Sequence, residues 1–462
     1  MQNAVNDILK TINFRQTTDW NVKRIASHFA ETYKYNRIPI GRCIERIKEN
    51  VTVNDRTMYK RLTIKTKGEG VCVRDEIKGK EIKTKKQYRV TAGQLAVSKI
   101  DARNGAFGIV PEKASGAIIT GNFWVFHINT SIVLPQYLVL ILSSEQFVQA
   151  WLECSNGSGN RMYLQERKFL DYEIPVPDLD IQARIVSSYE ESLNQAKQLI
   201  IEANNQEEKI FDYIKKELQI KDTENKKKEN VLQQIKYSSM VKWGATENLD
   251  AVSPKELFVS SKYDNVPLKT ISTINPSVSF PADLPENEVS FLPMECISDV
   301  FGEISEQRLG HISDSSGYTR FQENDVLWAK ITPCMQNGKC AIARYLINGY
   351  GYGSTEFHVI RTNIEKVLPE YVYCFLRSKR LRHAAKAYFS GSTGQQRVGA
   401  EFLEALTIPL IPISTQDQKT LSQEKLVYQV FLIKKEIKEL RRKSQHLLDS
   451  AKSEFETTVF GN

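Results

Sequence analysis

The chain has 462 residues, of which 41% are hydrophobic, and it carries 19 tyrosines and 20 phenylalanines. This composition excludes a disordered chain, and the length allows roughly two to four domains. The chain has no run of about 18 apolar residues, and its N-terminus does not resemble a signal peptide, so we expect no membrane span and a cytoplasmic location. Seven cysteines without a C-x-x-C pair favour reduced thiols and no metal site.

The formal charge of +8 is unevenly spread. Residues 1–175 hold 27 Lys and Arg against 17 Asp and Glu, which leaves 36 against 38 for the remainder. Basic clusters such as "KGKEIKTKKQYR" (Lys78–Arg89) could neutralise phosphates, although a solvated face is the default interpretation of any single cluster. The asymmetry favours a polyanionic partner for the N-terminal part.

In chain order, β-rich segments such as "RLTIKTKG" and "YRVTAGQLAVS" come first. A compact amphipathic helix is predicted next over "PQYLVLILSSEQFVQAWLE", with Pro135 in its first turn. A longer helix follows shortly after Pro177, and a polar, charged linker spans Lys221–Gly244. The same order then recurs: strands in "NDVLWAKI" and "EFHVIRT", a compact helix beginning near Pro369, and a long helix shortly after Pro412.

The recurrence is visible in the sequence itself. "VLPQYLVLILSS" (Val133–Ser144) matches "VLPEYVYCFLRS" (Val367–Ser378) without a gap, at a constant offset in residue number. Upstream, "YNRIPI" matches "YDNVPL", and Lys99-Ile100 matches Lys330-Ile331; downstream, the Gly-Ser and Ile-Pro pairs match at the offset of the ungapped stretch. Gln182 then pairs with Gln416, or with Gln418 if two residues are inserted. The chain is therefore a tandem duplication of a unit of about 230 residues.

Each predicted long helix lacks Gly and Pro for about forty residues and carries an apolar stripe flanked by Glu and Lys. This pattern is typical of a coiled coil, and forty residues at 1.5 Å each would make a rod of roughly 60 Å. Two separate amphipathic helices, each packed on its own domain, remain the alternative. The fold expected is α+β, with two pseudo-twofold-related domains separated by two long helices in an antiparallel coiled coil.

These segments resemble the DNA-specificity subunit of type I restriction-modification systems. The matching pieces are "GSGNRMYLQERKFLDYEIPVPDLDIQARI" and "GSTGQQRVGAEFLEALTIPLIPISTQDQ", each a Gly-Ser loop, an Ile-Pro segment and a helix-opening Gln. The second piece matches the family pattern more closely, because Asp417 directly precedes Gln418. The resemblance covers essentially the whole chain and implies the following division: recognition domain 1 at 1–177, spacer helix 1 at 178–220, a linker at 221–244, recognition domain 2 at 245–411 and spacer helix 2 at 412–460.

The resemblance further implies that each domain reads one half of a split double-stranded DNA target, with the coiled coil as a ruler. It implies a subunit that is not itself catalytic and that docks two adenine methyltransferase subunits and the restriction (translocase) subunits. No cofactor is expected in this chain, and S-adenosylmethionine, ATP and Mg²⁺ are expected on the partners. The Gly-Ser loop would lie near DNA or a partner, and the Ile-Pro strand would close each domain.

Side chains that bond base edges or phosphates are the candidates for DNA binding. In the first copy they are Lys60, Arg61, Lys86, Lys99, Arg103 and Arg161; in the second they are Arg320, Lys330, Asn337, Gln395, Gln396 and Arg397. "SKIDARNG" and "AKITPCMQNG" are favoured, because the copies share this frame and then diverge.

Catalytic motifs are missing from the sequence: the six histidines lack partners at informative spacing, and no P-loop is present. Two other classes remain open. A stand-alone regulator with two DNA-binding domains on a coiled-coil spacer would bind specific DNA without methyltransferase partners. A scaffold that binds only proteins would show no salt-dependent DNA binding.

Overall fold

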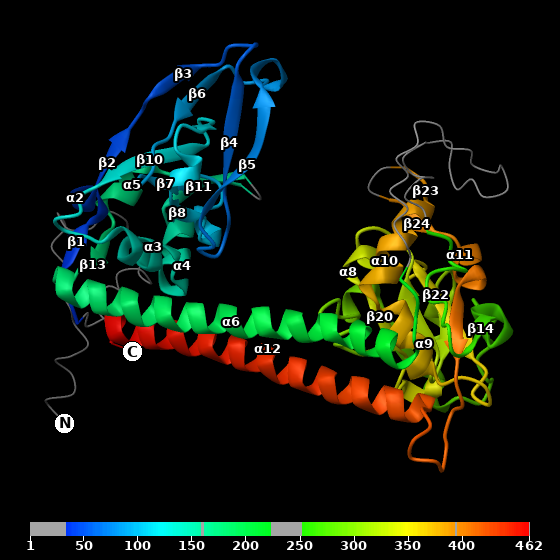
Figure 1. Ribbon diagram of the computed structural model, residues 1–462. Helices are drawn as coiled ribbons and strands as arrows, with labels where there is room; N and C mark the ends of the chain where they lie inside the picture. Colours follow the sequence, from blue (N-terminus) through cyan, green and yellow to red (C-terminus); the bar gives the residue numbers. More distant parts are fainter. Residues whose placement is uncertain (1–33, 159–160, 223–251, 393–394, 462) are drawn as a thin grey trace, which may run out of the picture. The chain divides into compact units, whose positions relative to one another are not determined.

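The computed structural model describes residues 34–158, 161–222, 252–392 and 395–461, and Figure 1 labels the elements used below. The chain divides into two compact units. Unit 1 comprises Met1–Gln198 and Lys443–Asn462, and unit 2 comprises Leu199–Arg442. Each unit contains one globular domain and part of each long helix. All of the predicted linker except residues 221–222 lies outside the described residues.

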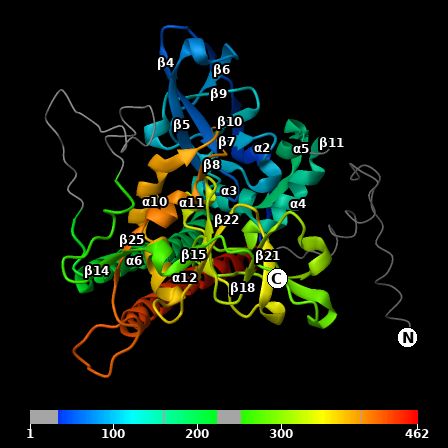
Figure 2. The same ribbon diagram turned by 90° about the vertical axis from the view of Figure 1, so that its right-hand side faces the viewer.

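The domain of unit 1 is built on two main sheets. The inner sheet has the order β2-β10-β7-β8 and is antiparallel, and the outer sheet has the order β3-β6-β9-β4-β5. Figure 2 shows the outer strands β4, β5, β6 and β9 on the side of the inner sheet away from α3. The inner strands are β2 (Ile44–Ile47), β7 (Leu95–Ser98), β8 (Phe107–Ile109) and β10 (Phe123–Ile128); the outer strands are β3 (Asn50–Thr52), β4 (Met58–Ile64), β5 (Val71–Lys78), β6 (Lys86–Arg89) and β9 (Ile118–Ile119).

The domain of unit 2 repeats the inner sheet in the same order, as β15-β22-β19-β20, but carries a different outer sheet, β17-β16-β21-β18. The inner strands are β15 (Ser272–Ile274), β19 (Val326–Ala329), β20 (Cys340–Ile342) and β22 (Phe357–Thr362). The outer strands are β16 (Glu288–Leu292), β17 (Arg308–His311), β18 (Thr319–Gln322) and β21 (Tyr350–Gly353). The duplicated scaffold is therefore the inner sheet, whereas the outer sheets differ between the copies.

The Ile-Pro segment that ends each copy pairs with the segment that begins it. In the first copy β1 (Arg37–Pro39) runs antiparallel to β13 (Glu173–Pro175), and in the second β14 (Asp264–Pro267) runs antiparallel to β25 (Thr407–Leu410). The prediction that the Ile-Pro strand closes each domain is confirmed. A buried tyrosine hydroxyl donates to the same strand in each copy: Tyr137 to the Pro175 carbonyl at 3.1 Å, and Tyr371 to the Pro409 carbonyl at 2.7 Å.

The single compact helix expected in each copy is in fact two helices. They are α3 (Pro135–Ser143) and α4 (Glu145–Glu153) in the first copy, and α9 (Pro369–Leu376) and α10 (Lys379–Ala385) in the second. The break falls at Ser144 and Ser378, which have extended backbone angles. Each serine hydroxyl donates to the carbonyl three residues before it, and Ser378 Oγ also accepts from the Leu381 amide at 3.2 Å. Serine stops one helix and begins the next because its hydroxyl competes for backbone groups.

The long helices are α6 (Leu179–Glu217) and α12 (Gln423–Phe460), and they pair antiparallel. In unit 1, Ser188 Oγ lies 3.3 Å from a Glu454 carboxylate oxygen, and Ser444 Oγ donates to the Ala196 carbonyl at 2.9 Å. The residue numbers of the α12 partners therefore fall as the residue numbers along α6 rise, so the two helices run antiparallel. In unit 2, Arg441 binds Glu207 at 2.9 Å. The coiled-coil prediction is confirmed, and the alternative of two separately packed helices is not supported.

The start of α12 corrects the predicted equivalence of the glutamines. Gln182 and Gln423 are both fully buried, whereas Gln416 and Gln418 are exposed and precede the helix. Asp417 lies in a turn, where its carboxylate accepts from the Lys419 amide at 2.9 Å. The second long helix thus begins at Gln423 rather than shortly after Pro412. Because Gln423 lies seven positions beyond Gln416, the second copy carries an insertion of that length before its long helix.

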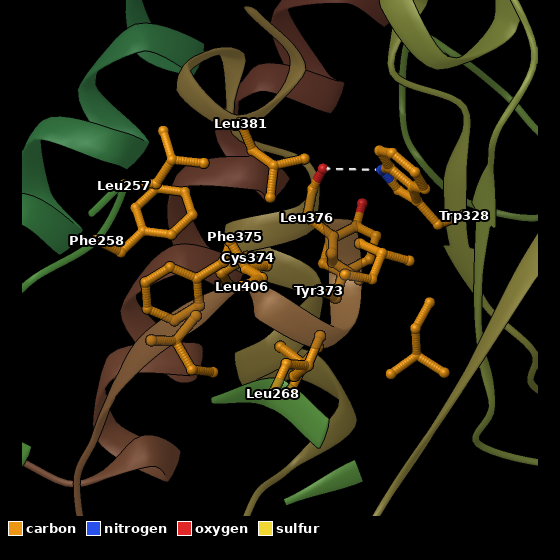
Figure 3. Packing of buried hydrophobic residues seen from close by; sticks show 14 of the residues in the cluster. Leu257, Phe258, Leu268, Trp328, Tyr373, Cys374, Phe375, Leu376, Leu381 and Leu406 are labelled. Atoms are coloured by element: carbon orange, nitrogen blue, oxygen red, sulfur yellow. Dashed lines mark hydrogen bonds between the residues drawn. The ribbon is translucent and has the colours of Figure 1, made fainter. Parts of the chain in front are cut away.

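The domain cores extend onto the long helices within each unit. In unit 2, Ile214 of α6, Leu218 directly after it, and Leu426 and Val430 of α12 belong to the same buried cluster as residues of α9. Figure 3 shows part of this cluster, including the hydrogen bond from Trp328 Nε1 to the Leu376 carbonyl at 3.3 Å. The other α-helices of the described residues are α2 (Ile40–Cys43), α5 (Glu166–Asp171), α8 (Cys334–Asn337) and α11 (Ala400–Ala405). Two small hairpins pair β11 (Ser155–Ser158) with β12 (Arg161–Leu164), and β23 (Phe389–Ser390) with β24 (Arg397–Val398).

Candidate nucleic-acid interface

The shared Lys-Ile frame lies beside the small hairpin in both copies. In the first copy the Leu164 amide of β12 donates to the Lys99 carbonyl at 2.8 Å, and in the second the Val398 amide of β24 donates to the Lys330 carbonyl at 3.0 Å. The Thr332 amide also donates to the Gln396 carbonyl at 2.9 Å. The backbone therefore places the candidate lysine next to the Gly-Ser loop by the same contact in each domain.

In the first copy, two cations lie over one aromatic surface. The Lys99 ammonium is 5.5 Å from the centre of the Trp124 ring, and the Arg46 guanidinium is 5.3 Å from the rings of Trp124 and of Phe126. Arg46 Nη1 lies 3.5 Å from Glu166. Desolvation lowers the pKa of Lys99, and the charge of Arg46 lowers it further. An electronegative group placed here, either a phosphate oxygen or a base-edge acceptor such as O6 or N7 of guanine, would relieve the repulsion between the two cations.

The corresponding site in the second copy is arranged differently. Arg397 of β24 forms a bidentate pair with Glu356, with Nε at 2.9 Å and Nη2 at 2.7 Å from the carboxylate oxygens. This hydrogen bonding lowers the pKa of Glu356. The Lys330 amide donates to the Glu356 carbonyl at 2.9 Å, so the pair and the candidate lysine are held together. A guanidinium already engaged by a carboxylate has fewer donors left for DNA than Lys330 has.

His358 is buried and occupies the position that Trp124 has in the first copy, at the offset of the ungapped repeat. Its ring is stacked on Trp328 with the centroids 6.2 Å apart. Nε2 lies 2.9 Å from the Val398 carbonyl, and Nδ1 lies 3.0 Å from the Asn275 amide nitrogen. A carbonyl can only accept, so Nε2 carries the proton and Nδ1 accepts from Asn275. Burial lowers the pKa of His358, and the neutral ring therefore anchors the hairpin to the inner sheet.

Three DNA-binding candidates of the first copy lie on the outer sheet, whereas Lys99 follows β7 of the inner sheet. Lys60 and Arg61 are on β4 and Lys86 is on β6. Arg61 is paired with Asp75 of the neighbouring strand at 2.7 and 2.6 Å, whereas Lys60 and Lys86 are exposed. These two lysines are therefore suited to phosphate contacts. The main role of Arg61 is to link β4 to β5 through its ion pair with Asp75.

The outer sheet of the second copy presents an aromatic cluster that the sequence analysis missed. Phe291, Tyr318 and Tyr352 have ring centroids 5.1 to 5.6 Å apart, and Tyr318 is 46% exposed. A Cβ atom on Gly310 would lie 2.6 Å from the Tyr352 hydroxyl, so only glycine allows the ring to lie over β17. On β18, Arg320 places its guanidinium 4.9 Å from the Phe280 ring. The run "YGYG" (Tyr350–Gly353) was the available signal, because glycines beside aromatic residues in a strand mark close packing.

The remaining candidates are placed as follows. Arg103 belongs to a 3-10 turn, Ala102–Asn104, that follows β7, and Arg161 is the first residue of β12. Asn337 is exposed at the end of α8, and Gln395 is exposed just before β24. The structure thus gathers Lys330, Gln395, Gln396 and Arg397 in one region, and leaves Lys60, Arg61, Lys86 and Arg320 on the outer sheets.

Features of other site types are scarce in the described ranges. No group of three or more His, Cys, Asp or Glu residues that could hold a metal ion occurs among the described residues. The seven cysteines form no disulfide within the described residues, and burial raises the pKa of four of them, Cys43, Cys296, Cys340 and Cys374. Within the described part of the chain, no helix is long and apolar enough to cross a membrane.

The two copies of the chain both resemble known proteins. A family model described as the type I restriction modification DNA specificity domain matches residues 38–205 and 260–442. The chain is similar to the specificity subunits of the Escherichia coli type I restriction enzymes EcoEI, at 35% identity over 164 residues, and EcoAI, at 37% over 152 residues. These stretches cover 35% and 33% of this chain but only 27% and 26% of the relatives, so the match spans about a quarter of their length.

A solved structure has a similar fold. It comes from work on complex assembly and conformational transition of the type I R-M system, and it aligns with a TM-score of 0.50 over 92% of this chain and 97% of that chain. The sequence identity is 14%, so the likeness is one of fold alone.

Proposed function

Because this chain belongs to the family of type I restriction-modification DNA specificity domains, with two matches along its length, we propose that it is the DNA sequence-specificity subunit of such a complex. The observation that supports this function best is the duplication itself. Two copies share an inner sheet, a helix pair and a buried glutamine, yet carry different outer sheets. A common scaffold with divergent surfaces is what two different half-site specificities require.

Each domain would read one half of a bipartite double-stranded target. Exposed cations such as Lys60 and Lys86 would bind phosphates and set the register on the duplex. Base edges would be read from the segment at Lys99 in the first copy, and from the region of Lys330 and Gln396 in the second. Amide and guanidinium side chains suit this role, because they can form paired hydrogen bonds to adenine or guanine in the major groove.

The chemistry would reside on partner subunits. The proposed partners are two adenine methyltransferase subunits and restriction (translocase) subunits, which would carry S-adenosylmethionine, ATP and Mg²⁺. This chain would act without a catalytic centre of its own. Its contribution would be to bind DNA and to hold the partners relative to the two half-sites.

The first experiment is a pull-down of the tagged chain from its native cells, followed by mass spectrometry. An adenine methyltransferase in about twofold excess is the expected result, and methylome sequencing would then identify the bipartite target. Recovery of the chain without any methyltransferase, combined with sequence-specific DNA binding by the chain alone, would overturn the assignment in favour of a stand-alone regulator. A chain that binds neither would exclude both.

The matched variants for this test are Lys99→Gln and Lys330→Gln. They change the same position of the frame in the two domains, and each would be purified with its partners and used to select from random duplexes. Loss of preference in one half-site only, and in opposite halves for the two variants, is expected.

A further inference from the structure

Unit 2 contains a cavity of about 320 Å³ between the two long helices and the helix pair α9–α10. Its apolar wall includes Ile210 and Phe211 of α6 and Val430 and Ile437 of α12. Tyr373 and Cys374 of α9, which Figure 3 labels together with Leu376, also line the cavity. A cavity of this size lies at the lower end of the range for small-molecule sites, and most of its surface is apolar.

The polar part of the lining is mostly cationic. Five basic residues line the cavity, against three acidic ones. The basic residues are Arg377, Lys379, Arg380, Arg382 and Lys434; the acidic ones are Glu207, Glu208 and Asp212. Two of the three acids are already engaged, since Glu207 binds Arg441 at 2.9 Å and Glu208 binds Lys379 at 2.8 Å. The net field in the cavity therefore favours a negative charge.

Lys434 forms no salt bridge among the described residues, and Arg380 and Arg382 form none there either. The acid that acts on Lys434 is Glu303, which is itself paired with Lys438 at 2.8 Å. The only hydrogen bond of the Lys434 ammonium among the described residues is to the Tyr373 hydroxyl, at 2.9 Å, and the ammonium also lies 4.6 Å from the centre of the Tyr373 ring. An ammonium has three N–H donors, so two of them have no acceptor within the described part of the chain. Desolvation lowers the pKa of Lys434, and the nearby charge of Arg377 lowers it further. Arg380 and Arg382 each also have a buried Nε without a partner.

The first copy shows that the scaffold does not need these cations. The buried glutamines align α12 with α6, which places Leu193 at the position of Lys434. The ungapped repeat places Val139, Ser143 and Val148 at the positions of Tyr373, Arg377 and Arg382. The same helix packing is thus achieved in unit 1 with uncharged side chains. A partly buried cation that the fold does not require is costly unless something compensates it.

We propose that this cavity binds a small amphipathic anion, with its apolar body between α6 and α12 and its carboxylate or phosphate on Lys434. The anion would accept hydrogen bonds from the two free N–H groups of the ammonium, and it would pair a charge that has no salt bridge among the described residues. The occupied cavity would join α6, α12 and α9–α10 within unit 2, so ligand binding would stabilise that unit by mass action. The proposal is independent of DNA binding, and either can fail without the other.

The probe is sodium octanoate, titrated into the full-length chain by calorimetry below the concentration at which it forms micelles. Acetate carries the charge without the apolar body, and 1-octanol carries the body without the charge. One saturable site for octanoate is expected, with at least tenfold weaker binding of both controls. Absence of octanoate binding, or equal binding of octanol, would overturn the proposal.

Lys434→Met keeps the length of the side chain and removes its charge, so it should weaken octanoate binding at least tenfold. Lys434→Arg should retain binding. Lys435→Met is the matched control, because Lys435 is the exposed neighbour on the same helix. The affinity of the Lys435→Met protein for octanoate should equal that of the wild type. Equal affinity of the Lys434→Met and Lys435→Met proteins for octanoate would refute the assignment. As a localisation that needs no variant, 8-bromooctanoate in crystals should give an anomalous peak in the cavity, and a peak elsewhere alone would count against it.

Discussion

Gln182 and Gln423 make the same three hydrogen bonds at the starts of the two long helices. Gln182 Oε1 accepts from the Leu134 amide at 2.8 Å, and its Nε2 donates to the carbonyls of Ile132 and Pro177. Gln423 does the same with the equivalent residues of the second copy, Leu368, Lys366 and Ile411, at 2.8, 3.0 and 2.8 Å. Each amide thus ties the start of a long helix to the loop before α3 or α9.

Replacing either glutamine by alanine should destabilise the protein. Gln423→Ala would leave a buried amide and two carbonyls without partners, and the expected cost is roughly 1–3 kcal/mol. Gln182→Ala should have a similar effect. Gln418→Ala is the control. Because Gln418 is exposed, this change should alter the free energy of unfolding by no more than about 0.5 kcal/mol. Midpoints of urea unfolding measure the difference, and a larger effect at Gln418 than at Gln423 would contradict the assignment.

The coiled coil should act as a ruler for the half-site spacing. Deleting residues 197–203 from α6 and 437–443 from α12 removes one heptad from each helix and preserves the apolar stripe. Seven residues correspond to about 10 Å of helix, and thus to a gap shorter by about three base pairs. Selection of random duplexes by the assembled complex gives the preferred gap. An unchanged gap in a folded deletion protein would rule out the ruler.

Lys60 and Lys86 should contribute binding energy without sequence preference. Each Lys→Ala change is expected to reduce the slope of log affinity against log salt by about 1, because one phosphate contact is lost. Lys435→Ala, at an exposed position of α12, should leave the slope unchanged. The measurement is fluorescence anisotropy on a target duplex and on an unrelated one. A loss confined to the target duplex would instead make the lysine a base-reading residue.

His358 should make the stability of unit 2 depend on pH. Its pKa is lowered from the ordinary 6.5 by burial, so the unfolded chain binds the proton more readily than the folded one. The contribution is present in full above pH 6.5 and is lost as the pH falls from there through the lower pKa of the folded state. Urea unfolding between about pH 8 and pH 5 should therefore show a steeper loss for the wild type than for His358→Gln. Parallel curves would mean that the buried ring is not the group that titrates.

Much of the architecture could be predicted from local pattern. The duplication, the long helices and the closing Ile-Pro strands follow from an ungapped repeat, from periodicity and from the absence of Gly and Pro, all of which are local signals. The helix break at Ser144 and Ser378 was readable in principle, since serine favours helix starts, but the apolar periodicity continues through it and masks the break.

The candidate interface was less predictable. The first copy has Trp124 where the second has His358. The Trp124 ring lies beneath the cations of Lys99 and Arg46, whereas the His358 ring forms hydrogen bonds with the Val398 carbonyl and with Asn275. Which cations remain available depends on neighbours in space. Arg61 and Arg397 looked equivalent to Lys60 and Lys330 as charges, but Asp75 and Glu356 engage them.

By itself, the sequence determined the family resemblance, the two copies and the helical spacers, because these depend on order and periodicity along the chain. Only the tertiary structure decided which glutamine begins α12, since Gln416, Gln418 and Gln423 differ in burial and not in chemistry. The tertiary structure also decided which groups pair with two carbonyls that match in the repeat, those of Leu142 and Leu376. Their donors are tryptophans from different elements, Trp151 of α4 and Trp328 of β19. The physical reason is that a buried polar group must be paired, and a partner distant in sequence can satisfy it as well as a neighbour.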